Sequence, residues 1–510
     1  PGSGLRGATL LPMYAAVSSA SLSGIDASEV RVEVDIAGGL PGMFIVGLPD
    51  TAVREARERV RAALRNSNLP WPKRRTVVNL APADLRKEGP ALDLPIALAV
   101  LSAQAALPPG CLEGYLVLGE LALDGGLRPV RGALNAALLA RASGYSRLLL
   151  PAANQHEVGF LIGIQIVAVR SLEEAVRCLR QGVLPEVAPG PVPATGAAER
   201  KDMSDVRGQL AARRALEVAA AGGHNILLTG PPGTGKSMLA ERLPGLLPLL
   251  DEDEALTVTR IRSAAGLKPQ GLIRQPPYRA PHHSVSAVAL LGAQRPGEIS
   301  LAHEGVLFLD ELGEFPGRLL DLLRQPLETG SIRVDRARFQ LELPAAFQLV
   351  AARNPCPCGW HGSQARTCGC TAQQRHAYLR RLSGPLLDRI DLSVAVPHVP
   401  AADLLALPRG EPSATVRERV HGARSLALRR QGIRNSRLAG EALRTHSRLP
   451  QPAAAALKRL LHRSDLSSRG LDRLLRLART IADLAGSDRI HSEHVAEAFG
   501  YAAGVGTPGL

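Results

Sequence analysis

A glycine-rich segment followed by lysine and serine could bind the phosphates of a nucleotide. Residues 225–239 read NILLTGPPGTGKSML: an apolar strand, the spacing Gly-x-x-x-x-Gly-Lys-Ser, and the start of a helix. The glycines let backbone N–H groups close around phosphates, Lys236 reaches the β- and γ-phosphates, and Ser237 binds Mg²⁺. This context predicts a nucleotide-binding loop made of Gly230, Pro231, Pro232, Gly233, Thr234, Gly235, Lys236, Ser237 and Met238.

A second apolar run ends in two carboxylates. Residues 305–312 read GVLFLDEL, so that Asp310 and Glu311 follow four apolar residues at the carboxyl edge of a predicted parallel sheet. Downstream of a phosphate loop, Asp310 is expected to hold Mg²⁺, and Glu311 is expected to orient or deprotonate the attacking water. The two motifs together predict hydrolysis of ATP.

Four of the six cysteines fall within fifteen positions. Cys356, Cys358, Cys368 and Cys370 form two Cys-x-Cys pairs separated by nine residues. In a reducing compartment such clusters favour metal binding over disulfides, and four thiolates suit tetrahedral Zn²⁺. Four free thiols or a redox switch remain alternatives, because the spacing is tighter than the usual Cys-x-x-Cys. His361 is a spare candidate ligand.

The elements that must position these residues indicate an α/β multidomain chain. The first domain alternates strand-like runs at 30–36, 76–80, 115–119, 147–150 and 164–169 with helix-like runs at 51–65, 93–105 and 132–142. The predicted parts are a flexible or non-native N-terminus (1–13), an α/β domain (14–180), a Pro- and Gly-rich linker (181–201), an ATPase core with a parallel sheet (202–398) carrying a four-cysteine insertion (356–370), and a C-terminal helical bundle (399–510).

Charge and hydropathy restrict the partners. The 510 residues carry a formal charge of +14, which favours a polyanion such as nucleic acid, although a GC-rich genome also enriches arginine. No apolar run approaches the roughly 18 to 20 residues of a membrane span. The best candidate, 91–107, contains Asp93, Pro95 and Gln104. Without a signal peptide, we expect a cytoplasmic protein with no membrane partner.

Over essentially its whole length the chain resembles the YifB/ComM family of magnesium-chelatase-like AAA+ ATPases. The resemblance implies ATP and Mg²⁺ as cofactors and a helical lid after the ATPase core. It is carried by DVRGQLAARRALEVAAAGGHN (205–225), GPPGTGKSMLAERLP (230–244), YRAPHHSVS (278–286), RPGEISLAHEGVLFLDELGEF (295–315), NPCPCG (354–359) and SGPLLDRIDL (383–392).

The family resemblance implies further catalytic roles. Asn354, after the strand FQLVAARN, matches the sensor that positions water, with Arg353 where methionine is commoner. Arg389 in LLDRIDL matches the arginine finger offered to a neighbouring subunit's ATP, and Arg469 in SSRGLDRLL matches the second sensor on the lid. A guanidinium suits both roles because it stays charged and binds phosphate bidentately. A finger acting on the next subunit implies a homo-oligomeric ring, which the family resemblance makes a hexamer.

The N-terminal domain resembles the proteolytic domain of Lon and the related C-terminal domain of the RadA recombination factor. A protease of this type needs a serine nucleophile after a Gly-Pro pair and a lysine base on a later helix. Here those positions are occupied by Ala91 and Leu134. We therefore expect a proteolytically inactive domain that forms the ring or binds DNA.

Two segments of the core resemble insertions that face the channel of such rings. YRAPHHSVSAVALLGAQRPGEIS carries basic residues at its tip, and ETGSIRVDRARFQLELPAAFQ alternates like a hairpin with its turn at 335–337. A solvated hairpin and structural histidines are the alternatives. The DNA-contact candidates are Arg279, His282, His283, Arg333, Arg336 and Arg338.

The resemblance implies a hexameric, ATP-driven DNA translocase or helicase. It would promote branch migration in homologous recombination during natural transformation, acting on single-stranded or branched DNA. The alternative is a chelatase-like, ATP-dependent remodeller of a protein or a metal-cofactor substrate. A Lon-like protease is disfavoured by Ala91 and Leu134.

Overall fold

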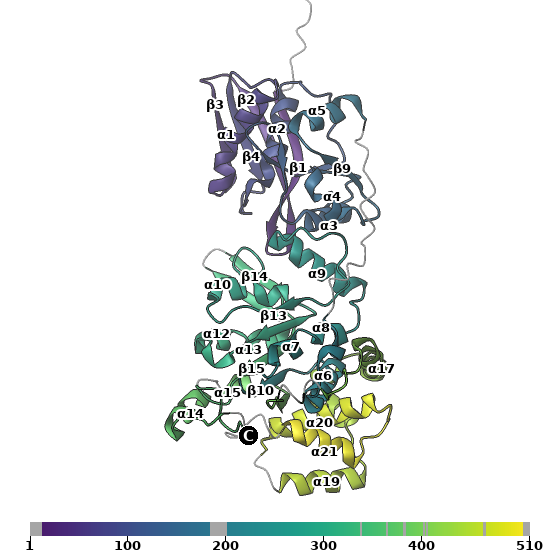
Figure 1. Ribbon diagram of the computed structural model, residues 1–510. Helices are drawn as coiled ribbons and strands as arrows, with labels where there is room; N and C mark the ends of the chain where they lie inside the picture. The colour runs from purple at the N-terminus through teal and green to yellow at the C-terminus, as the bar shows by residue number, and fades with distance from the viewer. Residues whose placement is uncertain are drawn as a thin grey trace, which may run out of the picture. The chain divides into compact units, whose positions relative to one another are not determined.

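The computed structural model describes residues 13–183, 201–336, 339–363, 366–380, 384–400, 403, 406–462 and 466–502 (Figure 1). Most of the predicted N-terminal segment and linker, residues 1–12 and 184–200, lies outside these ranges. The chain divides into two compact units. The first contains the residues up to 196 together with 255–273 and 294–296, and the second contains 197–254, 274–293 and 297–510.

The first unit is built on a mixed seven-stranded sheet in the order β3-β4-β2-β1-β5-β8-β9. Alternation explains strand β2, since Val30, Val32, Val34 and Ile36 are buried while charged residues stand between them. The strands are β1 (Tyr14–Ser23), β2 (Asp26–Ala37), β3 (Gly42–Val46), β4 (Arg75–Ala81), β5 (Tyr115–Val117), β8 (Arg147–Pro151) and β9 (Gln165–Val169). The helices include α1 (Thr51–Asn66), α2 (Asp93–Ala103), α3 (Ala133–Ala142) and α5 (Leu172–Gln181), so the predicted α/β class is confirmed.

Helix α2 accounts for the longest apolar run of the sequence. Its residues from 93 to 101 are all buried, as expected for a helix that is apolar on every side. Asp93 at its first turn is buried too, and its carboxylate accepts hydrogen bonds from Arg59 at 2.7 and 3.0 Å. The run is therefore a core helix of the first unit. Among the described residues, no helix is both long and apolar enough to span a bilayer.

One more segment belongs to the first unit although it follows the phosphate loop in sequence. Helix α9 (Glu252–Ala265) lies largely in this unit, because Ser263 O accepts a hydrogen bond from Gly132 N at 3.0 Å. Arg260 also pairs with Asp26 at 2.9 Å. Contacts between residues far apart in the sequence, and not chain order, decide where α9 packs.

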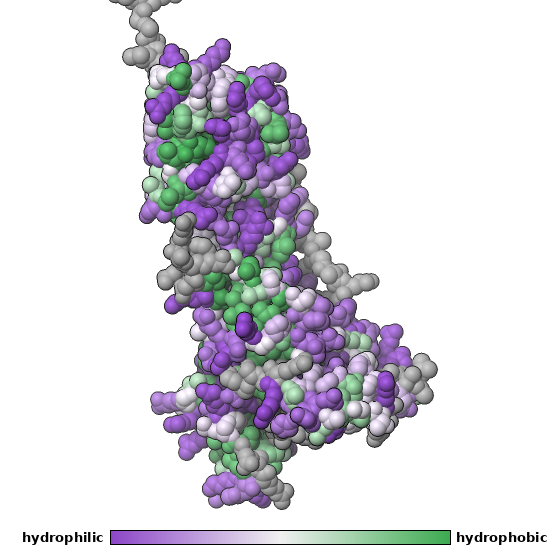
Figure 2. Space-filling model, turned by 90° about the vertical axis from the view of Figure 1, so that its left-hand side faces the viewer, coloured by the Kyte–Doolittle hydropathy of each residue, from purple (hydrophilic) through white to green (hydrophobic). Residues whose placement is uncertain are grey.

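The edge strand β3 leaves large apolar side chains exposed. Phe44 and Val46 on the strand, and Leu40 and Leu48 beside it, are each about half or more accessible to solvent. Figure 2 views the molecule from the side that carries β3 and shows green hydrophobic surface among purple hydrophilic residues. Exposed edge strands with apolar side chains are prone to associate with other chains.

The second unit contains a five-stranded parallel sheet in the order β11-β12-β15-β10-β16. Strands β10, β12 and β15 are buried at every position, as expected for a sheet covered on both faces. The strands are β10 (Ile226–Thr229), β11 (Tyr278–Arg279), β12 (Val306–Leu309), β15 (Gln348–Arg353) and β16 (Leu392–Ala395). This order brings the carboxyl ends of β12, β15 and β10 side by side.

The C-terminal helices share one hydrophobic core with this sheet. Leu474, Leu477 and Ile481 of α20 belong to the same buried cluster as Ile226 and Leu228 of β10. Figure 1 shows α19, α20 and α21 packed together in yellow. The helices are α17 (Ser413–Gln431), α18 (Gly440–His446), α19 (Gln451–Leu461), α20 (Ser468–Leu484) and α21 (Ser492–Ala502), which confirms the predicted helical bundle.

The predicted hairpin of the core is also present. Strands β13 (Ser331–Arg336) and β14 (Phe339–Pro344) pair antiparallel, with Ile332 opposite Leu343 and Val334 opposite Leu341. Because β13 extends to Arg336, residues 335 and 336 belong to the strand and not to the predicted turn. The remaining predicted turn residue, 337, lies outside the described ranges.

Candidate functional site: the phosphate loop and its neighbours

The phosphate loop joins β10 to helix α7 (Lys236–Ala240). Gly233 and Gly235 have φ angles of +75° and +89°, a region that side chains disfavour. At Gly230 a Cβ atom would stand 2.2 Å from the carbonyl oxygen of Val396. The glycine spacing seen in the sequence is therefore required by the backbone of this loop.

Lys236 is held over the loop by oxygen atoms. Its Nζ donates hydrogen bonds to the carbonyls of Gly230 and Pro231, each at 2.8 Å, and to Asn354 Oδ1 at 3.2 Å. Burial lowers the pKa of Lys236, while the charges of nearby Asp310 and Glu311 oppose this shift. Phosphate oxygens carry more charge than these carbonyls and would compete for the ammonium group.

The two predicted magnesium ligands are in direct contact. Ser237 Oγ donates a hydrogen bond to Asp310 Oδ2 at 2.6 Å, across from α7 to the end of β12. Asp310 Oδ1 accepts a hydrogen bond from the N–H of Glu311 at 2.9 Å. A hydroxyl and a carboxylate are the hard oxygen ligands that Mg²⁺ takes beside phosphates, so the residues present fit this ion.

Glu311 lies beside the two histidines of the 278–286 segment. Its Oε2 stands 3.7 Å from His283 Nδ1, and its backbone has a φ of +50°. The His283 ring is centred 4.0 Å from that of His282 and meets Phe315 edge-on at 6.4 Å. His282 Nδ1 lies 2.8 Å from Ser284 Oγ. The structure thus places both histidines at the end of the site that carries Glu311.

Asn354 follows β15 directly and reaches the loop through Lys236. The preceding Arg353 is buried, and its Nε donates a hydrogen bond to Thr229 Oγ1 at 3.2 Å. Burial lowers the pKa of Arg353. The unusual arginine is thus accommodated within the sheet, and Asn354 keeps its contact with Lys236.

The two arginines with predicted roles in phosphate binding belong to one basic group. Arg389 pairs with Glu328 of α13 (Arg324–Thr329), and Arg469 donates a hydrogen bond to Asp388 Oδ2 at 3.1 Å. Burial lowers the pKa of Arg389, and the charges of Arg324 and Arg469 lower it further. The structure therefore brings Arg324, Arg389 and Arg469 into one electrostatic cluster.

The sequence analysis did not single out Arg473. This side chain is buried on α20, and its Nη2 donates a hydrogen bond to the carbonyl of Asp388 at 3.1 Å. It fixes the backbone immediately before Arg389. The available signal was its spacing of four from Arg469, which places both arginines on one face of a helix.

The remaining DNA-contact candidates differ in their surroundings. Arg279 forms a bidentate pair with Glu298, with both distances at 2.6 Å, so its guanidinium is already engaged within the subunit. Arg333 is exposed on β13. Arg336 belongs to the same strand, but its side chain, like the whole of Arg338, lies outside the described parts.

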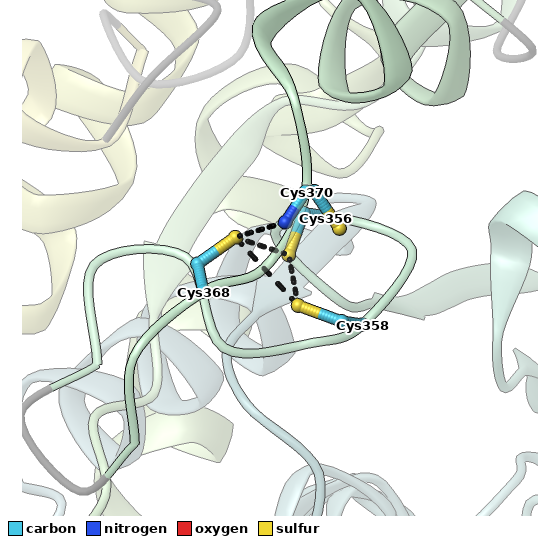
Figure 3. Close-up of side chains that lie close together, drawn as sticks. All are labelled: Cys356, Cys358, Cys368 and Cys370. Carbon is cyan, nitrogen blue, oxygen red and sulfur yellow. Dashed lines mark hydrogen bonds between the residues drawn. The ribbon is translucent and has the colours of Figure 1, made fainter.

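The four clustered cysteines lie close together after β15, as Figure 3 shows. Their sulfur atoms all lie within 4.8 Å of one another, and none is in a disulfide. Burial raises the pKa of the Cys356 thiol to about 12, whereas the N–H of Trp360 lowers that of Cys358 to about 6. The arrangement is a possible metal site.

The first unit lacks protease groups at the two positions that Lon resemblance singles out. Ala91 lines a cavity of about 270 Å³, and Leu134 is fully buried in α3. A methyl and an isobutyl group supply neither a nucleophile nor a base. The cavity is also lined by Glu88, Arg131 and Arg295.

Three family models match separate parts of the chain. Residues 202–404 match the family model described as "Magnesium chelatase, subunit ChlI". Residues 32–154 match "Subunit ChlI of Mg-chelatase", and residues 410–502 match "Magnesium chelatase, subunit ChlI C-terminal". The first model spans the phosphate loop, the acidic strand and the cysteine cluster.

Individual relatives extend over nearly the full length. The uncharacterized protein YifB of Escherichia coli (strain K12) is 46% identical over 486 residues, covering 94% of this chain and 95% of that protein. Competence protein ComM of Haemophilus influenzae is 43% identical over 503 residues, covering 96% and 97%. The magnesium-chelatase 38 kDa subunit of Cereibacter sphaeroides is 28% identical over 149 residues, only 26% of this chain and 45% of that protein.

The family model on residues 32–154 carries the name of chelatase. The N-terminal unit therefore does not by itself separate a translocase from a chelatase-like protein. The extent of similarity does distinguish the YifB and ComM proteins from the chelatase subunit. The former two are 46% and 43% identical over 94% and 96% of this chain, whereas the chelatase subunit is 28% identical over 26% of it. The chain belongs to the YifB/ComM family of magnesium-chelatase-like AAA+ ATPases.

Proposed function

We propose that this chain forms a hexameric ATP-driven translocase that acts on single-stranded or branched DNA and promotes branch migration in homologous recombination during natural transformation. The observation that carries ATP hydrolysis is the pair of contacts made by consecutive residues of the phosphate loop, from Lys236 to Asn354 and from Ser237 to Asp310. The similarity to a competence protein and the charge of +14 support DNA as the substrate.

Hydrolysis would use groups that already lie together. Lys236 exchanges the carbonyls of Gly230 and Pro231 for phosphate oxygens, and Asn354 stays close enough to orient water. Glu311 accepts a proton from that water as it attacks the γ-phosphate. Mg²⁺, held by Ser237 and Asp310, supplies charge neutralisation at the phosphates when bound.

The basic cluster supports a site completed by the neighbouring subunit. Arg324 and Arg469 each repel Arg389, and the three arginines pair with the exposed or half-exposed carboxylates of Asp321, Asp388 and Glu328. The γ-phosphate of an adjacent subunit is an anion that suits such a group. We assign Arg389 as the arginine finger and Arg469 as its partner on the same neighbouring nucleotide, which requires a closed ring.

Fewer residues remain as DNA-contact candidates than the sequence alone suggests. Arg333 is the described, exposed candidate on the hairpin, and backbone phosphate contacts from such residues are independent of base sequence. Arg279 is not carried forward, because Glu298 already occupies its guanidinium. His283 faces Glu311 and is better placed to influence hydrolysis than to grip DNA.

A chelatase-like remodeller of a protein or metal-cofactor substrate is the second candidate. It is favoured by the names of the three family models, which all refer to magnesium chelatase. Such a protein would hydrolyse ATP at a rate independent of DNA.

The test measures ATP hydrolysis with and without DNA, and movement of a labelled Holliday junction with and without ATP. Wild type should show DNA-stimulated hydrolysis and ATP-dependent junction movement, and Lys236→Ala should lose both. Lys458→Ala, which removes an exposed lysine on α19, is the matched control and should behave as wild type. Hydrolysis indifferent to DNA, with no junction movement, would reject the translocase in favour of the remodeller.

A further inference from the structure

The cysteine cluster lies against the phosphate loop. We propose that Cys356, Cys358, Cys368 and Cys370 bind one structural Zn²⁺, and that this metal braces the phosphate loop through Gly359. The brace rests on the proposed ATP site, whereas the metal site stands on its own geometry.

The spacing of the sulfur atoms matches a tetrahedral metal site. Cys356 Sγ lies 3.4 Å from Cys358 Sγ and 3.6 Å from Cys368 Sγ, and the latter two sulfurs are also 3.6 Å apart. Zinc–sulfur bonds of about 2.3 Å in a tetrahedron place the sulfurs about 3.8 Å from one another. A disulfide would need about 2.05 Å. The cluster therefore has the dimensions of a thiolate cage around one ion.

Backbone groups support two of the sulfurs. The N–H of His361 donates to Cys356 Sγ at 3.3 Å. The N–H of Cys370 donates to Cys368 Sγ at 3.4 Å, as Figure 3 shows. Such hydrogen bonds around the ligands orient them and stabilise their negative charge. The donors come from the loop itself, so binding of the ion and folding of the loop would occur together.

The loop has almost no apolar core to hold it without a metal. Among its described positions between 356 and 370, only Cys356 and Gly359 are buried. Trp360 is partly exposed, with the Arg366 guanidinium 5.8 Å from its ring centre. Apolar burial is thus small, and a bound ion is the remaining source of stability for a polar loop of this length.

Gly359 connects the cage to the nucleotide site. Its N–H donates to the carbonyl of Cys356 at 2.9 Å, which closes a turn in which Gly359 has a φ of +83°. A Cβ atom here would lie 2.6 Å from Pro232 Cδ and 3.9 Å from Asn354 Cγ. The turn therefore packs its backbone against the phosphate loop, and Asn354 is covalently joined to the same turn two residues earlier.

The metal is tested first, on full-length protein purified under reducing conditions without chelator. Zinc released per subunit should be one equivalent in wild type and should fall in Cys358→Ser, whose side chain is exposed and does not contribute to a core. Cys111→Ser, a cysteine of the first unit, is the control and should keep its zinc. Zinc near zero in reduced wild type would overturn the proposal.

The brace is tested with two glycines that share a left-handed backbone. Gly359→Ala places a methyl group against Pro232, whereas at Gly362, with a φ of +74°, nothing lies within 4 Å of the added atom. We expect Gly359→Ala to retain zinc but to lower ATP hydrolysis by about tenfold to a hundredfold, the scale of a displacement of about 1 Å. Gly362→Ala should retain both zinc and activity.

Binding of a fluorescent ATP analogue separates the two proposals. Zinc-depleted wild type and Cys358→Ser should bind the analogue more weakly than zinc-loaded wild type, and added Zn²⁺ should restore binding only to the former. Equal ATP hydrolysis by zinc-loaded Gly359→Ala and Gly362→Ala would reject the brace while leaving the metal site intact. A zinc-loaded wild type that does not bind the analogue would instead refute the proposed ATP site.

Discussion

The two units of this chain use α/β folds in different ways. In the second unit, the carboxyl ends of parallel strands bring a lysine, a hydroxyl and two carboxylates to one phosphate loop. In the first unit, the positions expected to hold a nucleophile and a base carry Ala91 and Leu134. The comparison teaches that the fold supplies a place for chemistry, while the side chains at that place decide whether chemistry occurs.

Removal of the proposed arginine finger should produce the largest change in the second unit. Arg389→Ala is expected to lower ATP hydrolysis by about 10³-fold or more, since developing charge on the phosphate loses its partner. Steady-state hydrolysis measures this effect. Mixing Arg389→Ala with Lys236→Ala subunits should restore part of the activity, because each subunit supplies what its neighbour lacks. No recovery in mixed rings would place Arg389 outside the neighbouring site.

Glu311→Gln should separate binding from turnover. The amide cannot accept a proton from water, so we expect hydrolysis to fall by about 10² to 10⁴-fold while ATP binding persists. Single-turnover hydrolysis and equilibrium binding give the two quantities. Glu441→Gln, an exposed substitution in α18, is the control. Retained hydrolysis in Glu311→Gln would refute the assignment.

A smaller effect is expected from the histidine beside Glu311. His283→Ala frees the Glu311 carboxylate and should raise hydrolysis in the absence of DNA by about twofold to tenfold, the scale of one polar contact. The KM for ATP should stay unchanged, because the contact does not involve the phosphate loop. His421→Ala changes an exposed histidine of α17 and serves as the control. A lower rate would show that His283 supports Glu311 instead.

A substitution in the first unit should change the stability of the protein and leave ATP hydrolysis unchanged. Burial raises the pKa of Glu157, although hydrogen bonds from Ser263, Asn154 and the N–H of Leu134 oppose the shift. The folded state therefore holds this proton more tightly than the unfolded chain. Protonated Glu157 therefore contributes its full stabilisation below the pKa that this group has in the unfolded chain. The contribution is lost as the pH rises through the pKa of Glu157 in the folded state.

Glu157→Gln removes this titration. The difference in thermal stability between wild type and the variant should shift in favour of the variant as pH rises from about 5 to about 8. Thermal melting at several pH values measures the shift, and ATP hydrolysis by the variant should match wild type. A difference that does not vary with pH would show that Glu157 titrates alike in both states.

Local sequence patterns predicted the α/β class and the backbone demands of the phosphate loop. The spacing of Gly230, Gly233 and Gly235 specifies positions where a side chain would clash or strain the chain. The roles assigned to individual side chains stay predictions. Strands β1 and β3 of the first unit were not predicted. The serine and alanine of β1 give a weak alternating pattern, and β3 is an apolar run of only five residues, GMFIV, without polar alternation.

Contacts between distant residues could not be predicted from one sequence. Ser263 and Glu157 lie 106 positions apart, so nothing local shows that α9 packs with the first unit. Likewise, the pairing of Arg279 with Glu298 depends on how a loop returns beside β12. Charge and the resemblance of its segment to a channel-facing insertion made Arg279 a DNA candidate, whereas the packed structure gives it a partner inside the subunit.

The core shared by β10 and α20 also bears on how force would be delivered. Lifting α20 from the sheet would expose Leu474, Leu477 and Ile481, at a cost of roughly 2 kcal/mol for each side chain. Buried polar contacts add to this, because His224 bridges to Thr480 at 2.7 Å. The sheet and α20 would therefore travel as a single block during each cycle. In the proposed ring, the conformational change that accompanies hydrolysis would then occur at the interfaces between subunits, where Arg389 and Arg469 are proposed to act.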